Sequence, residues 1–146
     1  MFLEDLPLGH EIVCGDFVLS SAEIIDFAHR FDPQPWHLDD ALARETYFAG
    51  LCASGLHTQA AAIGLMVRAI AGVAIVAGGA LNAAHFRAPV RPDRRYVVTA
   101  RWTQARPSAS NAARGVAVID IVAADADGAV VMEAGVTYIV ARRLRS

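Results

Sequence analysis

The sequence contains no lysine: all 13 of its basic residues are arginines. A protein without lysine cannot form a Schiff base with a carbonyl substrate or with pyridoxal phosphate, and it cannot bind nucleotide phosphates through a P-loop lysine. The 15 acidic residues leave a formal net charge of only -2. No strong field of either sign therefore draws the chain to nucleic acid or to an anionic membrane surface.

Cysteine is also scarce, since Cys14 and Cys52 are the only two and do not form a CxxC pair. Their placement indicates neither a disulfide framework nor a zinc site, and we expect no metal and no other cofactor. The first residues contain no basic segment followed by an apolar one, so the sequence predicts no secretory signal. A cytoplasmic location is the default expectation.

Hydrophobic residues make up 55% of the chain, which is enough for a sizeable core, and the length of 146 residues predicts a single domain spanning residues 1–146. The longest apolar run extends from Ala60 to Leu81 and is interrupted by Arg68 and by glycines. An arginine at the centre of a bilayer costs about 2.5–3.5 kcal/mol. The run therefore favours a buried core helix over a membrane span.

The first half of the chain is predicted to be helical. Ser20, followed three residues later by Glu23, has the form of a capping box that begins a helix. This helix is expected to stop at Asp32, because Pro33 disfavours helical geometry at the residue before it. Pro35 is expected to prevent the helix from resuming.

A short helical turn is expected at Asp39–Arg44, and the Gly50–Leu56 stretch leads into a long helix ending near Ile70. That helix is apolar on nearly every side, so we expect it to be buried nearly all round. The second half is rich in Val, Ile, Thr and aromatic residues and predicts the strands that cover it. The predicted strands are Gly79–Ala88, Arg95–Arg106, Arg114–Ala124 and Val130–Arg142, with Glu11–Leu19 as a candidate edge strand. The fold class is therefore α+β, an antiparallel sheet wrapped around a long central helix.

Asp32 and His37 lie five positions apart, with Pro33 and Pro35 between them. In a continuous helix this spacing turns two side chains to different faces, whereas the prolines predict a stiff, extended loop that aims both at one target. A carboxylate beside an imidazole is a pair suited to general acid–base catalysis. On these residues alone a structural role stays open, because Asp before Pro is a common turn former and His37 can bond a backbone carbonyl.

The entrance to the long helix is the second feature that suggests chemistry. It is rich in small residues, and the N–H groups of a helix's first turn attract developing negative charge. The amide of Gly55 could stabilise an enolate oxygen there. The alternative is that Gly50 and Gly55 only permit close helix packing while Ser54 caps the helix.

The run from Phe31 to Thr58 resembles the signature region of the MaoC-like acyl dehydratases, the (R)-specific enoyl-CoA hydratase group. In that family a D-x-N-P-x-H-x-D pattern precedes a glycine-containing entrance to the central helix. Here Gln34 stands where the family has Asn, and Ser54 stands where the family has His before the glycine, with His57 close by. Trp36 is bulkier than the usual apolar residue at its position. These departures leave the substrate class open.

The resemblance implies a hotdog fold, normally a dimer whose sheets join edge to edge with an acyl tunnel near the interface. It implies an enzyme that reversibly hydrates a trans-2-enoyl thioester, with an enoyl-CoA as the expected substrate, without a cofactor. Asp32 and His37 would hold the water and act as base and acid, and the Gly55 amide would bind the thioester oxygen. The motif positions expected to contact substrate are Gln34, Trp36, Ser54 and His57.

Arg87, Arg91 and Arg94 cluster around a predicted turn, where they could contact the phosphates of CoA or form an ordinary solvated loop. Two other functions remain as alternatives to the hydratase. A hotdog thioesterase needs a carboxylate on the long helix, and the segment from Gly50 to Ile70 contains no Asp or Glu. A non-catalytic acyl-thioester-binding subunit would keep the tunnel and the homodimer but not the reaction.

Overall fold

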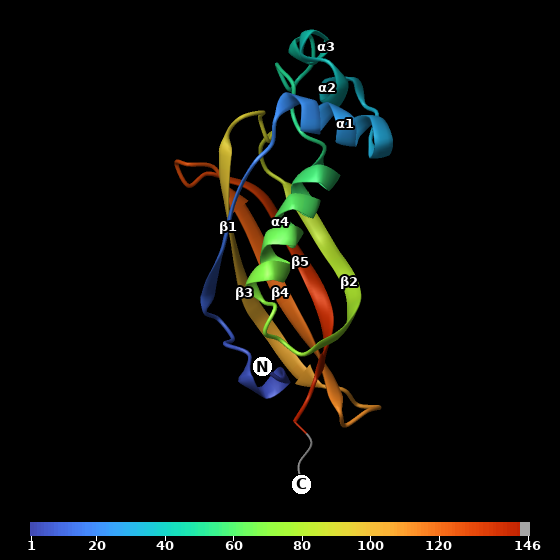
Figure 1. The fold of residues 1–146 in the computed structure, drawn as a ribbon, viewed down its shortest axis with the longest axis vertical. Helices are drawn as coiled ribbons and strands as arrows, with labels where there is room; N and C mark the ends of the chain where they lie inside the picture. The colour runs from blue at the N-terminus through green and yellow to red at the C-terminus, as the bar shows by residue number, and fades with distance from the viewer. Residues whose placement is uncertain (144–146) are drawn as a thin grey trace.

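The computed structural model describes residues 1–143. Its main feature is a five-stranded antiparallel sheet in the order β1-β3-β4-β5-β2, with the long helix α4 lying across one face (Figure 1). This confirms the predicted α+β class and the antiparallel sheet around a long helix. The elements in chain order are η1 (Leu3–Asp5), β1 (Glu11–Val18), α1 (Ser21–Phe31), α2 (Pro35–Leu38), α3 (Asp40–Arg44), α4 (Gly55–Ala69), β2 (Ile75–Phe86), β3 (Arg95–Pro107), β4 (Arg114–Ala124) and β5 (Val130–Ala141).

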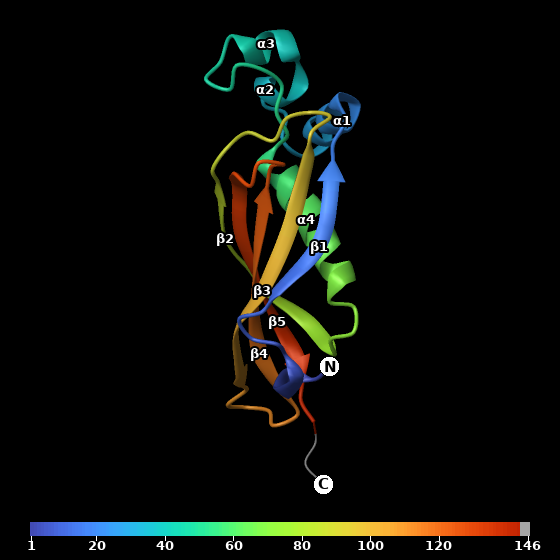
Figure 2. The same cartoon turned by 90° about the vertical axis from the view of Figure 1, so that its left-hand side faces the viewer.

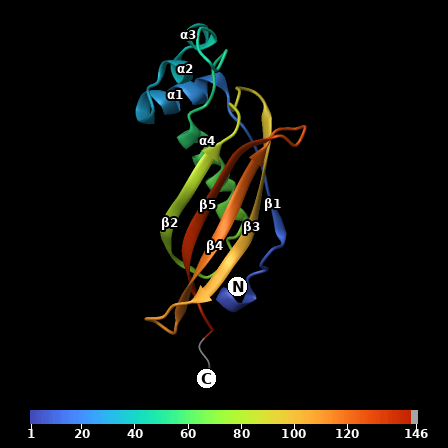
Figure 3. The same cartoon turned by 180° about the vertical axis from the view of Figure 1, so that it is seen from behind.

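The core lies between α4 and the sheet face that it covers. The buried helix residues Thr58, Ala62 and Met66 recur every four positions and so form a single stripe. Strand β3 alternates buried and more exposed residues, as a strand with one covered face does. Figure 2 shows β1 at one edge beside α4, and Figure 3 shows the uncovered face of the strands from behind. The inward residues of β3 are Tyr96, Val98, Ala100 and Trp102.

The prediction that α4 is buried nearly all round is wrong for the chain described. Leu56 is 54% exposed and Val67 is 44% exposed, on the side of the helix away from the sheet. The cause is geometric, because the five strands curve around one side of the helix only. The apolar composition of α4 therefore exceeds what this one chain needs for its core.

The apolar run from Ala60 to Leu81 divides between two elements, the end of α4 and the first half of β2. Strand β2 begins at Ile75, four residues before the predicted Gly79, because glycines are accommodated at the edge of the sheet where pairing with β5 is irregular. Within residues 1–143, no helix is long and apolar enough to cross a membrane. Glu11–Val18 is an edge strand, as expected.

The three short helices gather at one end of the sheet, above the N-terminus of α4 (Figure 1). As predicted, Ser20 caps α1 by accepting a hydrogen bond from the N–H of Glu23, and the helix stops before Asp32. The prediction that Pro35 prevents further helix is wrong, because Pro35 is the first residue of α2. Proline is favoured there, since a first-turn residue needs no N–H donor. As a result His37 lies on a helical turn and not in an extended loop.

Candidate active site

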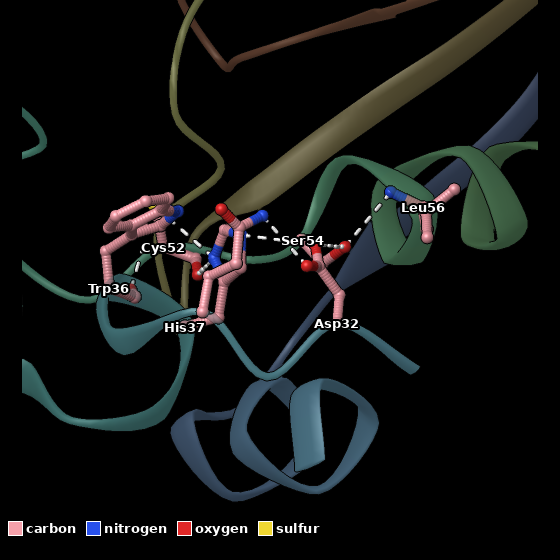
Figure 4. Close-up of polar contacts among 7 residues, drawn as sticks. Asp32, Trp36, His37, Cys52, Ser54 and Leu56 are labelled. Atoms are coloured by element: carbon pink, nitrogen blue, oxygen red, sulfur yellow. Dashed lines mark hydrogen bonds and ion pairs between the residues drawn. The ribbon is translucent and has the colours of Figure 1, made fainter. Parts of the chain in front are cut away.

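The structure brings Asp32 and His37 together at the N-terminus of α4 (Figure 4). Asp32 caps the C-terminus of α1, and His37 lies in α2. The Nε2 atom of His37 is 3.5 Å from the Oδ2 atom of Asp32. This separation exceeds that of a normal direct hydrogen bond, and a third group lying beside the pair can contact both atoms at once.

A backbone carbonyl fixes the tautomer of His37. Its ring is 5% exposed, and Nδ1 is 2.7 Å from the carbonyl oxygen of Cys52. A carbonyl only accepts hydrogen bonds, so Nδ1 carries a proton, and when the ring is neutral its unprotonated Nε2 faces Asp32. The thiol of Cys52 lies 3.8 Å from the same nitrogen, but burial raises the pKa of this thiol and keeps it protonated.

Two side chains donate hydrogen bonds to the Asp32 carboxylate. The Nε2 of Gln34 donates to Oδ1 at 2.8 Å, and the hydroxyl of Ser54 donates to Oδ2 at 2.7 Å. Partial burial acts to raise the pKa of Asp32, but these two bonds and the nearby His37 outweigh it, so the pKa lies below its ordinary value. Asp32 is therefore a carboxylate at neutral pH. Gln34, although longer than Asn, reaches the carboxylate.

Replacing Ser54 with Ala is expected to raise the pKa of Asp32, because a donor to the charged form is lost. The variant also loses the N-cap of α4, in which Ser54 accepts from the N–H of Leu56, at a cost of about 1 kcal/mol in the free energy of unfolding. Carboxyl carbon chemical shifts followed by NMR against pH measure the first effect. Ser20→Ala is the control, since it removes the cap of α1 and no donor to Asp32. An unchanged Asp32 titration in Ser54→Ala would contradict this account.

Gly55 begins α4 beside the carboxylate, and its N–H belongs to the first turn, which has no intrahelical partners. A Cβ atom added at Gly55 would lie 2.7 Å from the ring of Phe86, which comes from β2. The ring therefore packs directly on the glycine, and any other residue would push it aside. The absence of a side chain at Gly55 lets the ring of Phe86 pack against the start of α4, and the backbone N–H of Gly55 stays available to the site.

A pocket of about 440 Å³ opens over these groups. Its polar side is formed by Asp32, Gln34, His37 and the start of α4, and its apolar side by aromatic residues from three segments. The rings of Trp36 and Phe48 lie 5.4 Å apart within this apolar wall, and Tyr47 is 95% exposed at its rim. The aromatic lining residues are Trp36, Tyr47, Phe48 and Phe86.

The other residues predicted to contact the substrate do not all line the pocket. Ser54 is fully buried and binds Asp32, and His57 lies outside the residues that line the pocket and stacks on Phe27 with ring centroids 4.4 Å apart. Arg87 lines the pocket while paired with Glu133 on β5. Arg94 is exposed, in the turn before β3. Arg91 is not among the residues that line the pocket, and its guanidinium donates to backbone carbonyls, which argues against the predicted phosphate contact.

His57 makes the stability of the fold depend on pH. Burial lowers its pKa below the ordinary 6.5, and its Nδ1 is buried without a hydrogen-bond partner in the described chain. As the pH falls below 6.5, the unfolded chain therefore binds a proton at this residue that the folded chain does not. We expect the free energy of unfolding of the wild type, relative to that of His57→Phe, to decrease across this range. Denaturant titrations at several pH values measure the difference, with the exposed His29→Phe as control; a pH-independent difference would contradict the prediction.

Sequence reasoning missed several groups at this site. The sequence left open a bond from His37 to a backbone carbonyl, and the structure shows one, but nothing in the sequence indicated that the carbonyl would be that of Cys52. The aromatic pair Tyr47-Phe48 lies within the run from Phe31 to Thr58, but the residue types alone did not show that both side chains line the pocket. Within residues 1–143, no group of three or more His, Cys, Asp or Glu side chains is placed to hold a metal ion.

These features define a hotdog-type α+β protein with a carboxylate–imidazole pair at the head of its central helix. The model of the MaoC-like domain matches residues 11–122, and the chain belongs to the MaoC-like family. A MaoC-like dehydratase from Rhodospirillum rubrum is 33% identical, with a TM-score of 0.89 and coverage of 99% of each chain. Membership in this family supports a hydratase or dehydratase role.

Other relatives extend the comparison. The Bacillus subtilis protein YdeM is 34% identical over 94 residues, which are 64% of this chain and 67% of that protein. The (R)-hydratase from A. caviae, involved in PHA biosynthesis, is 19% identical, with a TM-score of 0.74 and coverage of 92% of this chain and 97% of that one, and so shares the fold. Two further structural neighbours are chains of Mycobacterium tuberculosis complexes, the HadBC complex and the ChsH1-ChsH2 complex.

Proposed function

We propose that this protein reversibly hydrates a trans-2-enoyl thioester, an enoyl-CoA, to the (R)-3-hydroxyacyl thioester. The observation that carries the proposal is the convergence of three groups on one pocket: the Asp32 carboxylate, the unprotonated Nε2 of His37 and the first-turn amide of Gly55. Asp32 can orient the water and supply negative charge, His37 can accept and return a proton, and Gly55 can stabilise an oxyanion, which together meet the needs of adding water across a conjugated double bond.

The reaction begins with a water held between Asp32 and His37. The Nε2 of His37 accepts one proton of this water, while Asp32 accepts a hydrogen bond from the other. The water oxygen bonds to C3, and the electron pair of the double bond moves to the thioester oxygen, where the N–H of Gly55 stabilises it. His37 then returns its proton to C2 as the carbonyl re-forms. The dyad ends in its starting state, so no redox agent or other co-reactant is needed.

The experiment that tests this proposal is the loss of enoyl absorbance when the purified protein is mixed with crotonyl-CoA and longer trans-2-enoyl-CoAs. Hydration that depends on protein concentration is the expected result, and chiral analysis of the product tests the (R) assignment. Thioester binding without turnover across the whole series would favour the non-catalytic binding subunit. A hotdog thioesterase is disfavoured because α4 carries no carboxylate, the residues from Gly55 to Ala69 containing no Asp or Glu.

Trp36 is proposed to limit the length of the acyl chain. Its ring packs against Phe48 and closes part of the apolar wall of the pocket. Replacing it with Leu opens space there, so the ratio of kcat/KM for a long enoyl-CoA to that for crotonyl-CoA is expected to rise about tenfold. The same assay measures the ratio, and Phe31→Leu, an exposed aromatic outside the pocket, is the control. An unchanged preference would exclude Trp36 as the residue that sets chain length.

The remaining parts of the proposal concern partners. Arg87, at the pocket, and Arg94, exposed on the next turn, are the candidate contacts for the phosphates of CoA. A homodimer or higher homo-oligomer is supported by the exposed apolar side chains on edge strand β2, with Leu81 68% exposed and Val76 55% exposed. A cytoplasmic location completes the proposal.

A further inference from the structure

One loop supplies two parts of the candidate site and leads directly into a third. Residues 45–54 connect α3 to α4 and end with the carbonyl of Cys52 that binds His37 and the hydroxyl of Ser54 that binds Asp32, directly before the amide of Gly55. The loop contains Ala49 at φ 54° and Gly50 at φ 150°, two conformations that L side chains rarely adopt. Such a segment keeps its shape only when its surroundings hold it.

The guanidinium of Arg91 holds this loop from one side. Its Nη1 donates to the carbonyl of Gly50 at 2.8 Å and reaches that of Leu51 at 3.4 Å, and its Nη2 donates to the carbonyl of Phe48. The three acceptors lie directly before Cys52 in the chain. Arg91 itself is fixed, because its N–H donates to the hydroxyl of Tyr96, a residue that is 2% exposed on β3.

Other hydrogen bonds also hold this loop, but they are made by its N–H groups and not by the carbonyls that Arg91 binds. Asp40 accepts the N–H of Leu51 at 2.9 Å, a bond that lowers the pKa of its carboxyl, with Arg44 adding to the effect. The N–H of Ala53 donates to the carbonyl of Val90, the neighbour of Arg91. The loop is therefore held through the N–H groups of Leu51 and Ala53 by acceptors, and through the carbonyls of residues 48, 50 and 51 by one arginine.

We infer that Arg91 is a positioning residue for the acid–base pair, acting through the loop on the tautomer of His37. The planar fork of a guanidinium can serve several carbonyls at once, whereas an ammonium is a single point of charge. Losing the fork releases the carbonyls of residues 48, 50 and 51. The Cys52 peptide is then held through its own and the neighbouring N–H groups, and its carbonyl, which keeps the proton on Nδ1, is expected to shift. The consequence for rate rests on the proposed hydration, but the consequence for the tautomer does not.

The experiment records long-range proton–nitrogen NMR correlations of the histidine rings at a pH where they are neutral, beside hydration kinetics. The variants are Arg91→Met, which removes every donor, Arg91→Lys, which keeps the charge, and Arg106→Met as a control at an exposed arginine in β3. His37→Asn assigns the signal. In the wild type and the control we expect the proton on Nδ1.

In Arg91→Lys we expect a partial shift of the proton to Nε2 and a kcat lower on the order of 10- to 100-fold, since small displacements of catalytic groups have effects of this size. KM should change by less than about threefold, and Arg91→Met should show larger effects in the same direction. Wild-type spectra and wild-type kcat in Arg91→Lys would overturn the inference, and the same readings decide it if Arg91→Met does not fold. If the wild type hydrates no substrate, the proposed function fails while the spectra still decide the role of Arg91.

Discussion

Replacing His37 with Asn is expected to lower kcat for enoyl-CoA hydration on the order of 10²–10⁴-fold, the usual contribution of a general acid–base group. The amide nitrogen of Asn lies near the position of Nδ1, so the variant can keep the hydrogen bond to the carbonyl of Cys52. It lacks the atom at the position of Nε2, which in the proposed reaction takes the proton from water and returns it to C2. The loss is therefore expected in the chemical step, as measured by single-turnover hydration of crotonyl-CoA.

His29→Asn is the matched control, because His29 is an exposed residue of α1 and is expected to have no effect on rate. Thermal unfolding of both variants shows whether a loss of activity follows from a loss of the fold. A folded His37→Asn protein that hydrates crotonyl-CoA within a few-fold of the wild-type rate would remove His37 from the proposed chemistry.

Asp32→Asn is expected to have an effect of similar size, on the order of 10²–10⁴-fold in kcat. The substitution keeps the shape of the side chain but removes the negative charge that faces Nε2 of His37 at 3.5 Å. The charge orients the water and stabilises the imidazolium that forms when His37 accepts a proton. The same single-turnover assay measures the loss, and Asp26→Asn, at an exposed position of α1, is the control.

The two substitutions are expected to be strongly non-additive. In the proposed reaction Asp32 and His37 act on one shared water, so removing either residue already removes most of what the pair does. The double variant should therefore be about as slow as the slower single variant. Full additivity of the two effects would mean that the residues act independently, which contradicts the shared-water account.

The sequence predicted the sheet better than the surroundings of the helix. Strands β3 and β4 matched their predicted ranges closely, because alternating apolar residues between turn signals are a local pattern. The burial of α4 could not be predicted in the same way, since composition gives the amount of apolar surface and not what covers it. Pro35 was misinterpreted because the same residue that ends one helix can begin another.

Within the site, the sequence could indicate residue types but not their partners. Asp32 and His37 were recognisable because two ionisable groups flank a proline-rich step in a short motif. Arg91 was interpreted from its neighbours as part of a basic cluster, and only the structure shows its guanidinium turned to a distant loop. His57 was included for its closeness in sequence, yet α4 carries it to the side that faces α1.

The central claim is that this site adds water to C3 of an enoyl thioester. The most direct test is to incubate the wild-type protein with crotonyl-CoA in ¹⁸O-labelled water and to examine the products by mass spectrometry. The account predicts an intact thioester that has gained one labelled water, with the ¹⁸O in the hydroxyl group at C3. Release of free CoA with ¹⁸O in a carboxylic acid, or recovery of unchanged crotonyl-CoA, would contradict it.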